Sequence, residues 1–161
     1  MGSEMCIRDS YNHFRTGRPT PIEPVFWSHY IDETNDPLYP FGYGLSYTTF
    51  EYSELKVMPD TEAFTITVEV RLKNTGSCEG QEVVQVYIHD VAASLARPVK
   101  ELKAFCKVKL GVGEEQHLQF VLVEAELGFF DQEGNYQLEN GAFDIFVGGS
   151  SAAVLQQRVR V

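Results

Sequence analysis

The chain has 161 residues and a mass of 18.2 kDa. This leaves room for one domain and a connector but not for the roughly 250 residues of a barrel enzyme. Its 13 basic and 23 acidic residues give a net charge of −10, which repels nucleic-acid phosphates and anionic lipid. We therefore expect no nucleic acid and no membrane as partner, and a neutral sugar or a protein fits better.

The N-terminal part of the chain differs from the rest, and residues 19–40 show no helical or alternating apolar period. Residues 1–10 lack the apolar run of a signal peptide, and we expect them to be a non-native tail. Five of the seven prolines lie between residues 19 and 40. Eight aromatic residues crowd residues 26–50, where a flexible spacer would carry Gly, Ser and charge. This composition predicts an extended linker that lies on a surface.

From residue 51 the sequence shows short runs of period two. The clearest run, residues 64–72, predicts a strand with one wet face. Further strands are predicted around residues 53–57, 84–88, 104–108, 118–122, 143–147 and 155–161. We expect the core to contain Ile66, Val68, Val70, Val86, Ile88, Phe120, Leu122, Phe143 and Ile145. The side chains expected to face outward are Thr67, Glu69, Arg71 and Asp144.

Turn residues separate these runs, as in Asn74-Thr75-Gly76 and Asn140-Gly141. The pattern predicts an all-β fold, an antiparallel immunoglobulin/fibronectin type III-like β-sandwich with an extended N-terminal linker. A closed barrel is the alternative. The only tryptophan, Trp27, lies in the linker, so the Cys, Trp, Cys framework of an immunoglobulin domain is missing and the fibronectin type is favoured.

Cysteine and histidine residues show no ligand spacing. The three cysteines include no C-x-x-C pair, and we expect Cys106 to fill core space. The four histidines are scattered, and no phosphate-binding or nucleophile motif is present. We therefore expect no metal and no cofactor.

A glycosidase needs two carboxyl groups about 5 to 10 Å apart. Glu114 lies in a turn that leads into a strand, and Asp131 precedes a glycine turn. Both are typical of solvated charges, so we nominate no catalytic residue.

The segment PLYPFGYGLSYTTF, residues 37–50, stands out, and we call it the strap. Its prolines keep the chain extended, its glycines allow close approach to a surface, and its aromatic rings offer flat contact area. This is typical of a docking segment. The alternative is an extension that folds over its own sandwich.

Several motifs resemble the C-terminal part of bacterial family 3 glycoside hydrolases, in the periplasmic β-glucosidase branch. These are TGRP at residues 16–19, Tyr30-Ile31-Asp32-Glu33, the strap, RPVKELKAF at residues 97–105, and the strand ends LGFFD and FVGGSS. Tyr136 departs from the tryptophan that many members carry. The resemblance covers residues 11–161. It implies that residues 11–50 are the end of an upstream α/β sandwich domain plus the aromatic linker, and that residues 51–161 are a fibronectin type III-like domain.

The resemblance further implies that the family's catalytic residues lie upstream of residue 11, in a barrel and an α/β sandwich domain. We therefore expect the chain to be a truncated, inactive piece of a retaining β-glucosidase that is periplasmic or secreted. Its expected role is to brace those two domains. We expect a β-glucoside substrate only through the parent enzyme. The residues expected to make interdomain docking contacts are Trp27, Tyr30, Tyr39, Phe41, Tyr43, Tyr47, Arg97 and Pro98. One alternative is a carbohydrate-binding β-sandwich module with an aromatic platform, and another is a free-standing adhesin-type domain.

Overall fold

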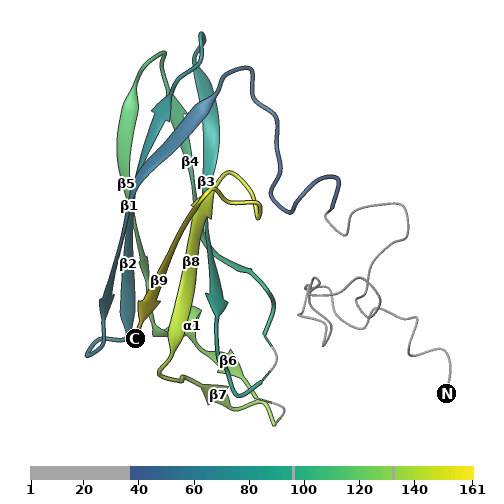
Figure 1. Ribbon diagram of the computed structural model, residues 1–161, viewed down its shortest axis with the longest axis vertical. Coiled ribbons are helices and arrows are strands. Elements are labelled where there is room, and N and C mark those ends of the chain that lie inside the picture. Colours follow the sequence, from purple (N-terminus) through teal and green to yellow (C-terminus); the bar gives the residue numbers. More distant parts are fainter. Residues whose placement is uncertain (1–36, 96, 132) are drawn as a thin grey trace, which may run out of the picture.

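The computed structural model describes residues 37–161 except 96 and 132. Two antiparallel sheets pack face to face, one with the order β1-β2-β5 and the other with the order β4-β3-β8-β9, while β6 and β7 form a short hairpin (Figure 1). The strands are β1 (Phe50–Asp60), β2 (Thr65–Asn74), β3 (Gly80–Asp90), β4 (Glu101–Leu110), β5 (Glu115–Leu122), β6 (Phe129–Phe130), β7 (Tyr136–Gln137), β8 (Ala142–Gly148) and β9 (Leu155–Arg160). A single helical turn, α1 (Glu124–Leu127), follows β5. The predicted β-sandwich is confirmed.

The period-two runs place one side chain in two toward the core. In β2, buried residues alternate with half-buried residues from Thr65 to Asn74. The buried hydrophobic core contains Val57, Ile66, Val68, Val70, Leu72, Val84, Val86, Ile88, Val108, Leu110, Leu118, Leu122, Leu127, Phe143, Ile145, Val147, Val159 and Val161. Phe120 is only half-buried and packs against this core. Thr67, Glu69 and Arg71 alternate with the buried residues of β2, on the outer face.

One expectation about a single side chain was wrong, and two further positions differ in detail from the predicted pattern. Cys106 is exposed, because β4 is the edge strand of its sheet and the facing sheet gives that position little cover. Asp144 is buried although it lies on the outer face of β8, because Arg158 on β9 lies directly opposite and binds its carboxylate. Phe64 precedes β2 in a turn with φ of 47°, and its side chain still packs against the core.

The second half of β3 is buried on both faces, from Val84 to Asp90. One face contributes Val84, Val86 and Ile88 to the core. The other face carries polar side chains, among them Gln85 and His89, which are covered by segments outside the sheets. The strap covers part of this face, and Figure 1 shows it leaving β1 and passing beside the turn that follows β8.

The end of the sandwich opposite the start of β1 holds α1 and the β6–β7 hairpin (Figure 1). In the part of the chain that the structure describes, no helix is long and apolar enough to cross a membrane.

Candidate docking surface

The strap is fixed to the outer face of β3 through its backbone. Gln85 Nε2 donates hydrogen bonds to the carbonyl oxygens of Gly42 (3.1 Å) and Gly149 (2.6 Å). The carbonyl oxygen of Phe41 accepts hydrogen bonds from the backbone N–H of Ser151 (2.8 Å) and from the hydroxyl of Tyr87 (3.4 Å). Two consecutive carbonyl groups of the strap are therefore held by the sandwich.

Gly42 is required at this contact for a conformational and a steric reason. Its φ of 78° lies in the left-handed region that side chains with a Cβ rarely adopt. A Cβ at this position would also collide with the side-chain amide of Gln85. Only glycine lets the strap approach β3 this closely.

The C-terminal end of the strap is held by Asn74, which is completely buried at the end of β2. Thr48 Oγ1 donates to Asn74 Oδ1 at 2.7 Å, and Asn74 Nδ2 donates to the carbonyl oxygens of Cys78 (2.9 Å) and Leu110 (3.1 Å). Both ends of its amide are hydrogen-bonded, and these hydrogen bonds offset the cost of burying Asn74, which joins the strap to Cys78 and Leu110.

While the backbone of the strap is fixed, its large side chains face solvent. The exposed fractions are 86% for Leu38, 68% for Tyr39, 56% for Phe41, 48% for Tyr43, 88% for Leu45 and 101% for Tyr47. The rings of Tyr39 and Tyr43 lie 5.4 Å apart, centroid to centroid, at a tilt of 41°. Contiguous apolar surface of this kind is unusual on a finished monomer and is typical of an interaction site.

One exposed ring next to the strap was not singled out from the sequence. Phe105 on β4 is the cross-strand partner of Gln85, and its side chain is 68% exposed. Side chains of a cross-strand pair share a face of the sheet, so Phe105 lies beside the strap contact made by Gln85. The alternation of β4 around buried Val108 and Leu110 is the sequence signal that would have placed Phe105 outward.

Arg97 and Pro98, two of the predicted docking residues, lie inside the domain. Pro98 is buried, and the Arg97 side chain is 7% exposed. Arg97 donates to Glu101 Oε1 through Nε (3.0 Å) and Nη2 (2.9 Å), and its guanidinium lies 4.9 Å from the centroid of the Phe129 ring. These contacts shape the loop before β4, and a docking role for Arg97 and Pro98 stays a prediction.

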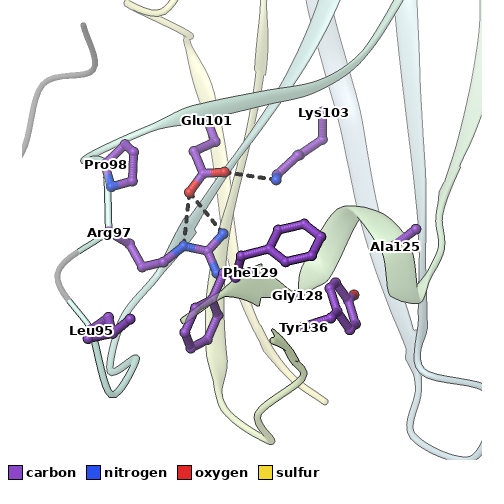
Figure 2. Close-up of a pocket in the computed structure, with 10 residues that line it drawn as sticks. Leu95, Arg97, Pro98, Glu101, Lys103, Ala125, Gly128, Phe129 and Tyr136 are labelled. Carbon is purple, nitrogen blue, oxygen red and sulfur yellow. Dashed lines mark hydrogen bonds and ion pairs between the residues drawn. The ribbon is translucent and has the colours of Figure 1, made fainter. Parts of the chain in front are cut away.

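Arg97 lies beside a shallow hollow of about 410 Å³ between the start of β4 and the β6–β7 hairpin (Figure 2). Burial alone would raise the pKa of Glu101, but Lys103 and Arg97 bind its carboxylate and hold the pKa below its ordinary value. Phe130, 69% exposed, meets Tyr136 edge to face at the rim.

The other predicted docking residues divide between exposed positions and undescribed ones. Tyr39, Phe41, Tyr43 and Tyr47 lie together on the strap with their side chains exposed. Trp27 and Tyr30 fall outside the described residues.

The two acidic residues considered for catalysis, Glu114 and Asp131, accept hydrogen bonds from residues of the turns in which they lie. Glu114 accepts a hydrogen bond from the backbone N–H of Gly111 at 2.7 Å. Asp131 accepts hydrogen bonds from the Gln137 side chain and from the backbone N–H of Asn135 and Glu133, which lower its pKa. Among the described residues, no group of three or more potential ligand side chains is placed to hold a metal ion.

Comparison with known proteins agrees with this architecture. Residues 82–151 match the family model of the fibronectin type III-like domain. The chain is 45% identical over 150 residues to the periplasmic β-glucosidase of Salmonella typhimurium, covering 91% of this chain and 20% of that protein. It is 42% identical over 141 residues to thermostable β-glucosidase B of Acetivibrio thermocellus, covering 85% of this chain and 19% of that protein.

A solved structure gives the same result. The β-glucosidase of Listeria innocua in complex with isofagomine superposes with a TM-score of 0.84 at 45% identity, covering 94% of this chain and 22% of that one. The sandwich is therefore a fibronectin type III-like domain. The chain matches the C-terminal portion of family 3 glycoside hydrolases of the β-glucosidase type, which implies a non-catalytic module of such an enzyme. It spans about one fifth of the length of these relatives.

Proposed function

We propose that this chain serves a family 3 β-glucosidase as a brace, and that the strap is the surface that docks against the catalytic domains. Hydrolysis of β-glucosides then belongs to those domains, and the module contributes stability and relative placement. A periplasmic or secreted location fits the name of the Salmonella relative. On its own, the chain should hydrolyse no aryl-β-glucoside.

The observation that carries this proposal is the contrast within the strap. Its backbone is bound to β3 through Gln85, and its Thr48 side chain is bound by Asn74 at the end of β2. Six of its large side chains remain exposed. An extension that folded over its own sandwich would bury those side chains and would not need fixed carbonyl groups. A strap with a fixed backbone and outward rings presents a preorganised apolar surface, which lowers the entropic cost of docking.

The energy available is sufficient for a brace. Burial of apolar area contributes roughly 25 cal/mol per Å². A few hundred Å² of strap surface would therefore stabilise an interdomain contact by several kcal/mol, of the size found between domains of one chain.

The hollow supports a second candidate, a carbohydrate-binding module. Phe130 lines the hollow with an exposed ring. Figure 2 shows the Glu101 and Lys103 side chains at the same hollow. Titration of the full chain with cellobiose, compared with its Phe130→Ala variant, tests this role. Binding by the wild type that the variant loses would favour it.

The bracing role is tested in a full-length enzyme. The chain replaces the matching C-terminal fifth of the Salmonella β-glucosidase. The thermal midpoint of this chimera is read from residual aryl-β-glucosidase activity, and that of the isolated chain from circular dichroism. The triple substitution Tyr39→Ser, Phe41→Ser and Tyr43→Ser should lower the midpoint of this chimera while leaving that of the isolated chain unchanged. Phe130→Ala, an equally exposed aromatic residue at the other end of the sandwich, is the matched control. Equal midpoints for the triple variant and the control would contradict the proposal.

A further inference from the structure

We propose that the docking surface continues from the strap onto β4, where Phe105 and Lys107 meet an acidic, partly apolar surface on the catalytic domains. This inference rests on the proposed bracing function and identifies the chemistry of the partner surface. It follows from the position of Phe105, from the charges around it and from the exposed edge on which both residues lie.

Phe105 and the strap form one continuous surface. Phe105 pairs with Gln85, whose side chain binds the strap at Gly42. The next residues along the same face are Lys107 and its cross-strand partner Val83, which is 37% exposed. A partner that covers Phe41 and Tyr43 is therefore placed to reach Phe105 across the buried side chain of Gln85.

Lys107 places one positive charge on the outer face of β4, on a molecule whose net charge is negative. The chain carries a net charge of −10. Lys107 is exposed, and among the described residues it makes no ion pair. The next lysine on this face, Lys109, is paired with Glu79 at 2.9 Å. On the other sheet, Arg71 and Lys73 both pair with Glu115, whereas the exposed Lys56, like Lys107, makes no ion pair among the described residues; Lys107 differs from Lys56 in lying beside the exposed Phe105. Complementary potentials fix the orientation of docked surfaces, so the unpaired Lys107 points to an acidic partner.

Protection of the edge strand explains Lys107 but does not explain the exposed Phe105. Edge lysines keep exposed strands from pairing with other chains, and Lys107 alone would need no other role. An exposed phenylalanine beside it works against that protection, because it adds apolar surface to the same edge. The pair is explained if the edge is covered in the assembled enzyme.

Lysine footprinting tests the inference directly. The chimera described above and the isolated chain are treated with acetic anhydride, and the modification rate of each lysine is read by mass spectrometry. Lys107 should react readily in the isolated chain and lose most of its reactivity in the chimera. Lys56, an exposed lysine on the other sheet, is the internal control and should react equally in both.

A charge reversal gives a second readout. Lys107→Glu and Phe105→Ala should lower the thermal midpoint of the chimera more than that of the isolated chain, and the deficit of Lys107→Glu should shrink as salt is added. Lys56→Glu and Phe130→Ala are the matched controls. If Lys107 reacts equally in both proteins while the triple strap variant still destabilises the chimera, this inference fails and the bracing function stands. If the strap variant also has no effect, both fail.

A second copy of this chain is the rival occupant of the edge. Its signature would be a dimer of the isolated chain in which Lys107 is already protected, and that result would overturn the inference.

Discussion

Gln85 holds Gly42 against the outer face of β3 through a hydrogen bond from its side-chain amide to the glycine carbonyl. The same amide group also donates to Gly149, so one buried side chain joins the strap to the turn after β8. The position of the docking surface depends on this glutamine, although the strap itself supplies the aromatic rings.

Replacing Gln85 by Ala should release the strap. Gln85 donates hydrogen bonds to two carbonyl oxygens, those of Gly42 and Gly149, and a buried group that loses its partner costs about 1–3 kcal/mol. The measurement is hydrogen exchange by mass spectrometry: the amides of Tyr43 and Ser151, both hydrogen-bonded in the native state, should exchange faster. Gly42→Ala should act in the same direction because of its positive φ. Exchange that matched that of Gln119→Ala, an exposed control, would mean that the strap is held by other contacts.

The pair formed by Asp144 and Arg158 should make folding stability depend on acid pH. Arg158 Nε and Nη2 donate to the two carboxylate oxygens at 2.6 and 2.8 Å, and they hold the pKa of Asp144 below its ordinary value. The folded state therefore favours the ionised form. This contribution is fully present above the unfolded pKa of about 3.9 and is lost as the pH falls through the folded value.

Asp144→Asn should cost about 1 kcal/mol at neutral pH, since Arg158 is largely solvated and water screens the pair. A double-mutant cycle gives the coupling energy of the pair. It compares the chemical denaturation of the wild type, Asp144→Asn, Arg158→Gln and the variant with both substitutions. A coupling energy of zero at neutral pH would show that the ion pair adds nothing.

Glu82 should give folding stability a pH dependence opposite to that of Asp144. Tyr52 donates a hydrogen bond to Glu82 Oε1 at 2.8 Å, but burial raises the pKa of the Glu82 carboxyl above its ordinary 4.5. The folded state then binds the proton more tightly than the unfolded state, so stability falls as the pH rises from the unfolded to the folded pKa.

Glu82→Gln keeps an acceptor for Tyr52 and should remove this loss. The denaturation midpoint of the variant, measured relative to that of the wild type, should therefore increase as the pH rises from acidic to neutral. Glu62→Gln, at an exposed position, should run parallel to the wild type. Parallel curves for both variants would refute the assignment.

Core substitutions should follow burial in the order Phe143, Phe120, Thr67. Phe143 is 2% exposed, and its replacement by Ala should cost about 3–5 kcal/mol. Phe120→Ala should cost less, because its ring is only half-buried at the edge of the core. Thr67→Ala, on the outer face, should cost under about 1 kcal/mol. The midpoints of urea denaturation measure this order. A larger loss of stability for Thr67→Ala than for Phe143→Ala would contradict the assignment of inward- and outward-facing side chains.

Alternation was enough to predict the sandwich, because a sheet with one buried face imposes period two on its sequence. It placed Ile66 and Ile145 in the core, where both have no exposed surface. It failed where burial depends on a neighbour that is distant in sequence. Asp144 is covered by Arg158, and Cys106 lies at a sheet edge whose exposure no local pattern reveals.

The candidate surface was predictable only in part. Prolines and aromatic residues marked the strap, since composition is visible without a fold. The anchors Gln85 and Asn74 were not found, because a buried amide shows its role only through partners elsewhere in the chain. Phe105 was missed because its place beside the strap depends on the pairing of β3 with β4.

The most direct test of the docking claim compares the strap rings in two settings. Hydroxyl-radical footprinting of Tyr39, Phe41 and Tyr43 is carried out on the isolated chain and on the chimera with the catalytic domains of the Salmonella enzyme, with Phe130 as the internal reference. We predict that all three rings oxidise readily in the isolated chain and are protected in the chimera, while Phe130 is oxidised equally in both. Oxidation of the strap rings at the same rate in both proteins would contradict the proposal that they dock against the catalytic domains.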